Sequence, residues 1–320
     1  MISLSPRFAL VLTLLFAGCT PEPEATPTGP YVLVLGTAQD AGLPQIGCDA
    51  PCCRRVRTEP ERARMVTSIL VADPRSGERW LLDASPDLGR QVELAEGHPA
   101  TRTSDSPRPP LFEGVFLTHA HMGHYTGLLD LGREAYGAKD LAVFGTERMN
   151  GFLRTNGPWS LLVETGGIEL RTLSPGEPIR LTSDLSVTAL VVPHRDEFSD
   201  TVAFLVEGPE RKLLYLPDID RFEVWERSIE DVLAGVDVAL LDATFYSADE
   251  IPGRSIEDIP HPLVSESIKR FRLLSEGERA KVVFTHLNHS NPIADTQSPE
   301  ARAVREAGMR VAREGMVFEL

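Results

Sequence analysis

From Tyr31 onward, short runs of β-branched and aliphatic residues alternate with segments of helical periodicity. This alternation is typical of α/β domains, in which helices cover the faces of β-sheets. The predicted strands are 31–36, 65–73, 79–83, 114–118, 141–145, 186–192, 201–207, 212–217, 237–242 and 281–285. The predicted helices are 86–96, 124–135, 222–234, 263–276 and 299–313. We therefore expect one large α/β domain over residues 31–320.

Polar residues with catalytic or metal-binding chemistry stand directly after several of these apolar runs. They are His119, His194, Asp218, Asp242 and His286. Loops at the ends of strands are where a rigid sheet commonly holds functional side chains. The five residues therefore predict a functional rim at one edge of the sheet structure.

The stretch THAHMGH holds three of the chain's eight histidines, His119, His121 and His124. Imidazole is a common ligand for divalent transition metals. The density of histidines therefore favours a metal site over a histidine cluster without metal.

A second group of candidate ligands is the run GCDAPCC, which holds Cys48, Cys52 and Cys53. An odd number of cysteines does not suit a framework made only of disulfides. Three thiolates at this spacing favour one structural Zn²⁺ that takes a fourth ligand from elsewhere in the chain. One disulfide with a free thiol is the alternative.

The N-terminus has the features of a lipoprotein signal. Arg7 precedes the apolar run FALVLTLLF, and the run ends in AGC with Cys19. Residues 1–19 are therefore predicted to be a signal peptide with lipidation at Cys19, and the proline-rich residues 20–30 a tether. The protein is then expected to be exported and membrane-anchored, facing the periplasm or the cell exterior. A plain signal peptide or an N-terminal membrane anchor is the alternative.

The formal net charge of −15 argues against nucleic acid as a partner, because a polyanion would be repelled. A small-molecule substrate is expected instead. The oligomeric state is left open.

The order of the polar motifs resembles the metallo-β-lactamase superfamily. The motifs are LLDASPD, THAHMGH, VVPHRDE, LYLPDID and VFTHLNH, in that order along the chain. Within the superfamily the chain is similar to the pyrroloquinoline quinone biosynthesis protein B family, through LGTAQDAGLPQIGC, GLLDLGREAYG and HLNHSNPI. The resemblance implies an αββα sandwich, in which two mixed sheets flanked by helices hold metals at one edge.

The resemblance also implies two neighbouring metal sites. The implied ligands are His119, His121 and His194 at the first site and His124 and His286 at the second, with Asp218 as the bridge. Asp218 and His124 would carry catalysis, and Asp83 would orient the ligands from behind. Gly123 departs from the family pattern, in which an aspartate at this position binds the second metal. Either the second site keeps three ligands or the protein binds a single metal.

Members of the same family carry a cysteine-bound structural zinc, which the resemblance assigns to Cys48, Cys52 and Cys53. A related branch, the cyclic phosphodiesterases of phosphonate metabolism, takes the fourth zinc ligand from a histidine three residues after its last active-site histidine. His289 has that spacing from His286.

These expectations describe a metal-dependent hydrolase that uses a metal-bound hydroxide against phosphoesters, esters, lactones or similar bonds. The expected cofactors are one or two Zn²⁺ at the active site and one structural Zn²⁺, with Fe²⁺ or Mn²⁺ as alternatives at the active site. A second hypothesis, implied by the resemblance, is an iron-dependent oxygenase or hydroxylase in quinone cofactor biosynthesis. The third is a non-catalytic metal-binding lipoprotein.

Four further polar residues are given minor roles. Asp242 is expected to orient a histidine or to cap a turn, while Asp196 and Asp220 are expected to be solvated loop residues. For His261, a contact with the substrate and a structural role are equally expected.

Overall fold

The computed structural model describes residues 27–98, 109–250 and 260–320. The predicted signal peptide, the lipidation site Cys19 and most of the predicted tether lie outside the described residues. Within the part of the chain that is described, no helix is both long and apolar enough to cross a membrane.

The described residues form two seven-stranded sheets, and the first has the order β14-β1-β2-β3-β4-β5-β6. Its strands are β1 (Tyr31–Gly36), β2 (Ser68–Asp73), β3 (Glu78–Leu82), β4 (Gly114–Phe116), β5 (Leu141–Gly145), β6 (Ile168–Thr172) and β14 (Val317–Glu319). Neighbours are antiparallel from β14 to β3 and parallel from β3 to β6, so the sheet is mixed.

The second sheet has the order β13-β12-β11-β10-β9-β8-β7. Its strands are β7 (Pro178–Arg180), β8 (Ser186–Val191), β9 (Val202–Glu207), β10 (Lys212–Leu216), β11 (Val238–Asp242), β12 (Val282–Thr285) and β13 (Arg310–Val311). It is also mixed, with antiparallel pairs from β7 to β10 and parallel pairs from β10 to β13.

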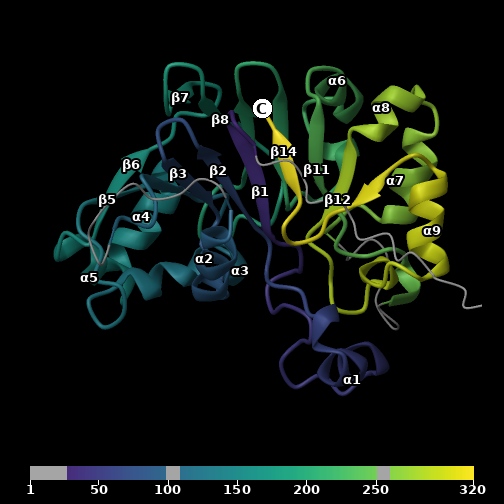
Figure 1. The fold of residues 1–320 in the computed structure, drawn as a ribbon, viewed down its shortest axis with the longest axis horizontal. Helices are drawn as coiled ribbons and strands as arrows, with labels where there is room; N and C mark the ends of the chain where they lie inside the picture. The colour runs from purple at the N-terminus through teal and green to yellow at the C-terminus, as the bar shows by residue number, and fades with distance from the viewer. Residues whose placement is uncertain (1–26, 99–108, 251–259) are drawn as a thin grey trace, which may run out of the picture.

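Helices cover the outer face of each sheet, on opposite sides of the molecule in Figure 1. Against the first sheet lie α2 (Leu88–Glu96), α4 (Glu147–Thr155) and α5 (Trp159–Glu164), with the short α3 (Met122–Tyr125) nearby. Against the second sheet lie α6 (Ile229–Ala234), α7 (Val264–Phe271), α8 (Glu276–Ala280) and α9 (Pro299–Glu306). The remaining helix, α1 (Pro51–Thr58), lies apart from both groups at the bottom of Figure 1.

Strand β1 shows why the layers stack in this way. Successive side chains of a strand point to opposite faces. Leu33 and Leu35 pack against the helices of the first sheet, while Val32 and Val34 pack between the two sheets. All are buried, and burying each such side chain contributes about 1.5–3 kcal/mol. A strand that is apolar on both faces fits only the interior of a layered sandwich, so the predicted αββα fold is confirmed.

Each of the ten predicted strands overlaps an observed strand. The predicted helix 124–135 is wrong: α3 ends at Tyr125, and a 3-10 helix follows over Thr126–Leu131. The Gly127 amide donates to the Ala84 carbonyl at 2.9 Å and not to a carbonyl one helical turn before it, so the regular helix is interrupted here. A side chain at Gly127 would also collide with the backbone oxygen of Ser85.

The other differences concern helix ends and short strands. The predicted helix 263–276 divides into α7 and α8, because the Ser275 hydroxyl caps a new helix by accepting from the Glu278 amide. The predicted helix 222–234 is regular only from Ile229, after a 3-10 turn over Phe222–Val224. The sequence did not predict α1, α4, α5 or the strands β6, β7, β13 and β14. These strands have two to five residues, too few to establish a period.

Candidate metal centre

The strand ends bring six predicted metal ligands together at one edge of the sandwich. His119, His121 and His124 follow β4, His194 follows β8, Asp218 follows β10 and His286 follows β12. Asp218 is at the centre, with Oδ2 3.5 Å from Nε2 of His119, 2.9 Å from that of His124 and 3.2 Å from that of His286. Its other oxygen lies 3.6 Å from Nε2 of His194. One strand of the first sheet and three strands of the second therefore contribute to one cluster.

Three imidazoles form the first half of the cluster. The ligand atoms of His119, His121 and His194 all lie within 4.8 Å of one another. Nε2 of His119 and Nδ1 of His121 are only 2.8 Å apart. His119 and His194 are buried, whereas His121 is partly exposed, so this half is reached from the side of His121.

In each histidine, the ring nitrogen that points away from the cluster contacts a carboxylate or a hydroxyl group. Nδ1 of His124 faces Asp83 Oδ2 at 2.8 Å, and Nδ1 of His194 faces Asp220 Oδ1 at 3.0 Å. The remaining pairs are His119 with the Thr118 hydroxyl at 3.0 Å, His286 with the Thr244 hydroxyl at 2.9 Å, and His121 Nε2 with Glu197 at 3.0 Å. Partners of this kind fix the tautomer and orientation of metal-binding imidazoles. The inward nitrogens are thereby left available.

Asp83 lies deepest in this supporting layer. Its carboxylate is fully buried and accepts hydrogen bonds from the Thr118 amide and hydroxyl and from the Tyr215 hydroxyl, besides facing His124. Its φ of +66° is in the left-handed region that non-glycine residues rarely adopt. His286 shares this feature, with φ +59°. Such backbone strain concentrates at functional sites, where surrounding contacts maintain it.

Burial and mutual repulsion set the charges in the cluster. Burial and the neighbouring His124 lower the pKa of His119 well below its usual value, which keeps the ring neutral. Burial alone would raise the pKa of Asp218, but the surrounding histidines, His286 first, lower it well below its usual value. Neutral imidazole, as at His119, together with an ionised carboxylate is the donor set of zinc, iron and manganese sites.

Unsatisfied polar atoms test whether a metal fits. Among the described residues, Nε2 of His124, His194 and His286 are buried and make no well-aligned hydrogen bond, although Asp218 Oδ2 lies 2.9 Å from that of His124. A buried polar atom without a partner costs about 1–3 kcal/mol. All three atoms surround Asp218, so one or two divalent cations would satisfy them together. The residues fit a metal centre.

Sequence reasoning missed several residues of this site. Asp220, expected to be solvated, instead supports His194, and Glu197 supports His121. Thr118 and Thr244 also support histidines. Both stand just after an apolar run, so their place beside the site could have been predicted from the sequence. Asp40 is the fifth: its carboxylate lies with His124 and His286, although it comes from a loop far away in the sequence.

His261 lies inside the cluster. Its Nδ1 is 2.8 Å from Asp242 Oδ2 and 3.6 Å from Asp218 Oδ1. Its ring centroid lies 5.5 Å from that of His194 and 6.1 Å from that of His286. Asp242 also accepts from the amides of Ile219 and Thr244, so it orients both His261 and the loops, as expected. His261 is buried, and its ligand atom lies within 4.8 Å of those of Asp218 and Asp242.

The cysteines form a second candidate centre. Nδ1 of His289 lies 3.7 Å from Sγ of Cys48, 3.6 Å from that of Cys52 and 3.4 Å from that of Cys53. All three cysteines are free thiols, which does not support the disulfide alternative. Burial raises the pKa of the Cys53 thiol to about 12, so a thiolate at this position needs a cation beside it. The four donors surround one point, as in a tetrahedral zinc site.

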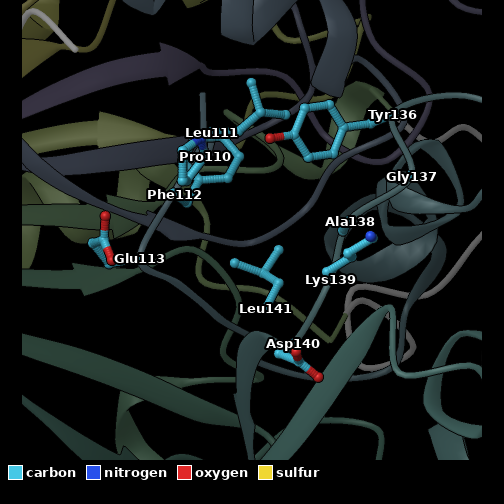
Figure 2. A pocket seen from close by; sticks show the side chains of 10 residues that line it. All are labelled: Pro110, Leu111, Phe112, Glu113, Tyr136, Gly137, Ala138, Lys139, Asp140 and Leu141. Carbon is cyan, nitrogen blue, oxygen red and sulfur yellow. The ribbon is translucent and has the colours of Figure 1, made fainter. Parts of the chain in front are cut away.

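A separate hollow of about 430 Å³ lies at the residues that precede β4 and β5. Because the histidine cluster is at the other ends of the strands, this hollow is at the opposite edge of the sheet. Figure 2 shows Glu113, Lys139 and Asp140 around it, together with the ring of Tyr136. The described residues that line it include no histidine or cysteine.

The sequence is similar to a known family of metal-binding fold and to curated proteins of one name. Residues 78–287 match the family described as Beta-lactamase superfamily domain. Coenzyme PQQ synthesis protein B of Methylobacterium radiotolerans is 30% identical, over 90% of this chain and 99% of the relative. The protein of the same name from Methylococcus capsulatus is 31% identical, again over 90% and 99%.

Two solved structures have a similar fold. The Zn²⁺-bound PqqB of Methylobacterium extorquens has a TM-score of 0.77 and 24% identity, over 91% of this chain and 100% of that chain. A diphosphatase from the PhnP family has a TM-score of 0.64 and 21% identity, over 91% and 97%.

Proposed function

Because the chain belongs to the metallo-β-lactamase superfamily, and within it to the coenzyme PQQ synthesis protein B family, we propose that it is a metal-dependent hydrolase acting on a small molecule. The observation that carries this proposal is the set of buried histidine Nε2 atoms that surround Asp218 without a well-aligned hydrogen bond. Such atoms are costly unless a cation binds them.

His119, His121 and His194 would hold the first metal, and His124 and His286 the second, with Asp218 shared between them. The Zn²⁺ in the Methylobacterium extorquens structure supports zinc as the cation. A bound divalent metal supplies Lewis-acid chemistry, lowering the pKa of a bound water and polarising a substrate oxygen. Asp218 faces both halves of the cluster and is therefore placed to accept a hydrogen bond from the attacking water. His261, beside it, would contact the substrate.

The substrate would approach past His121. Beside it, Glu197 is about half exposed, and the neighbouring Phe198 is 59% exposed. Phe198 also packs against Phe152, with ring centroids 5.4 Å apart, so an apolar surface borders the entrance. This combination suits a substrate with both a polar reacting group and an apolar part.

A second candidate function is supported by the near full-length likeness to coenzyme PQQ synthesis protein B. In this alternative the same cluster binds Fe²⁺ and the protein is a hydroxylase in quinone cofactor biosynthesis. Histidine and carboxylate ligands suit iron as well as zinc.

Metal analysis with turnover assays tests the proposal. The protein is purified once in air and once without oxygen, and its zinc, iron and manganese contents are measured. The hydrolase predicts zinc in both preparations, together with turnover of a phosphodiester or lactone. Stoichiometric iron in the anaerobic preparation, with turnover that requires oxygen, would favour the hydroxylase.

A His194→Ala variant assigns the metal to the cluster. This variant should lose the metal and the activity of the histidine cluster while keeping the metal of the cysteine cluster. His98→Ala, outside both clusters, is the matched control. Full metal content and activity in His194→Ala would refute the ligand assignment.

A further inference from the structure

Gly123 has no room for a side chain, because Asp40 fills the space beside it. A Cβ built at Gly123 would lie 2.6 Å from Oδ1 and 2.8 Å from Cα of Asp40, so the loop would have to shift. The Gly123 amide donates a hydrogen bond to Asp40 Oδ1 at 3.2 Å. Asp40 therefore stands where a side chain at position 123 would begin.

The Asp40 carboxylate lies with the second half of the histidine cluster. The ligand atoms of Asp40, His124 and His286 are all within 4.8 Å of one another. Nε2 of both histidines is buried and makes no well-aligned hydrogen bond. Two inward imidazole nitrogens and a carboxylate oxygen thus face one point.

Backbone hydrogen bonds tie the Asp40 loop to the loop of His286. The Gln39 amide donates to the Leu287 carbonyl at 2.9 Å, and the Leu287 amide donates to the Thr37 carbonyl at 2.8 Å. The Asn288 side-chain amide also donates to Gln39 Oε1 at 2.6 Å. Asp40 and His286 are therefore positioned by one hydrogen-bonded unit, as precise coordination requires.

We propose that Asp40 is the carboxylate ligand of the second metal, in the place of the aspartate that position 123 lacks. The inference rests on the proposed function, because it takes the histidine cluster as a metal centre. The second site then has Asp40, His124, His286 and the shared Asp218 as donors. Four nitrogen and oxygen ligands are the usual complement of a zinc ion, and two carboxylates balance its charge. The arrangement requires glycine at position 123, because any side chain there would collide with the loop of Asp40.

Zn²⁺ titration of metal-stripped protein tests the role of Asp40. Asp40→Asn keeps the size of the side chain and an oxygen that can accept from the Gly123 amide, but removes the charge. We expect one zinc equivalent to bind at least about 10–100-fold more weakly, by analogy with the loss of supporting groups around metals. The other equivalents should keep their affinity. Asp130→Asn changes an exposed carboxylate outside both clusters and should change nothing.

Two further measurements support the titration. Mn²⁺ bound as a neighbouring pair gives a spin-coupled electron paramagnetic resonance signal, which Asp40→Asn should convert to that of isolated ions. Asp40→Ala removes the carboxylate without adding a side chain at position 123, and it should weaken the binding of the same zinc equivalent. This variant also keeps the test decisive if Asp40→Asn folds poorly.

The outcomes separate the two proposals. Equal stoichiometry and affinity in wild type and Asp40→Asn would overturn the role of Asp40 and leave the proposed function standing. Wild-type protein that takes up zinc only at the cysteine cluster would refute the proposed function itself. A single zinc at the histidine cluster that is indifferent to Asp40→Asn would replace the two-metal site by a mononuclear centre.

Discussion

Oδ2 of Asp83 and Nδ1 of His124 lie 2.8 Å apart, and both side chains are fully buried. Asp83 comes from the end of β3 and His124 from α3, so the contact joins two loops of the first sheet. It also directs Nε2 of His124 toward Asp218, 2.9 Å away. The contact therefore connects the stability of the fold with the orientation of a candidate ligand.

We expect Asp83→Ala to affect stability and metal binding together. Removing one partner of a buried charged pair costs about 3–5 kcal/mol, and removing the group behind a ligand weakens metal binding about 10–100-fold. Denaturant unfolding and Zn²⁺ titration measure the two effects. A variant with native metal affinity and lower stability would show that Asp83 is only structural.

His261→Ala should lower kcat about 10²–10⁴-fold, the usual contribution of a positioned proton-transfer group, while the metal content stays unchanged. The reason is that His261 lies beside Asp218 but is not among the ligands proposed for either metal. Steady-state kinetics and elemental analysis of one preparation check this prediction. Loss of metal in the variant would mean that His261 is a ligand.

Removing a ligand of the cysteine cluster should lower stability without removing the metal of the histidine cluster. In small zinc domains, metal binding contributes about 10–16 kcal/mol of folding free energy, so His289→Ala should lower the unfolding temperature clearly. The measurements are thermal unfolding and metal content, which should fall by one equivalent. A thiol titration that finds a disulfide in the native protein would contradict the zinc site.

The predicted lipidation of Cys19 is testable in cells. A fatty-acid probe should label the wild-type protein and place it in the membrane fraction, because the apolar run before Cys19 has the composition of a lipoprotein signal. Cys19→Ser should abolish the labelling. Persistent labelling of this variant would exclude Cys19 as the lipid attachment site.

The sequence predicted the fold and most of the cluster because both depend on strands. The predicted strands are apolar runs, and His194, Asp218 and His286 stand where such runs end. Asp40 could not be predicted in this way, since it lies in a loop without period and meets Gly123 only through tertiary packing. The role of Asp220 was missed for a related reason: an acidic loop residue has the same local sequence whether it is solvated or supports a histidine.

The ends of helices were also predicted less well than the strands. Residues 124–135 have helical periodicity, but the Gly127 amide donates to the Ala84 carbonyl of a distant loop and not within a regular helix. A contact from a distant segment therefore overrides a local preference.

The shared space of Asp40 and Gly123 has a consequence for how this site can evolve. A side chain at 123 and the present position of Asp40 exclude each other, so neither position can change freely while the other stays fixed. A carboxylate gained at 123 before Asp40 is lost would meet a steric clash, and Asp40 lost first would leave the cluster one negative charge short. Substitutions at the two positions should therefore be strongly epistatic. Among related chains, a carboxylate at the equivalent of 123 should accompany a small residue at the equivalent of 40.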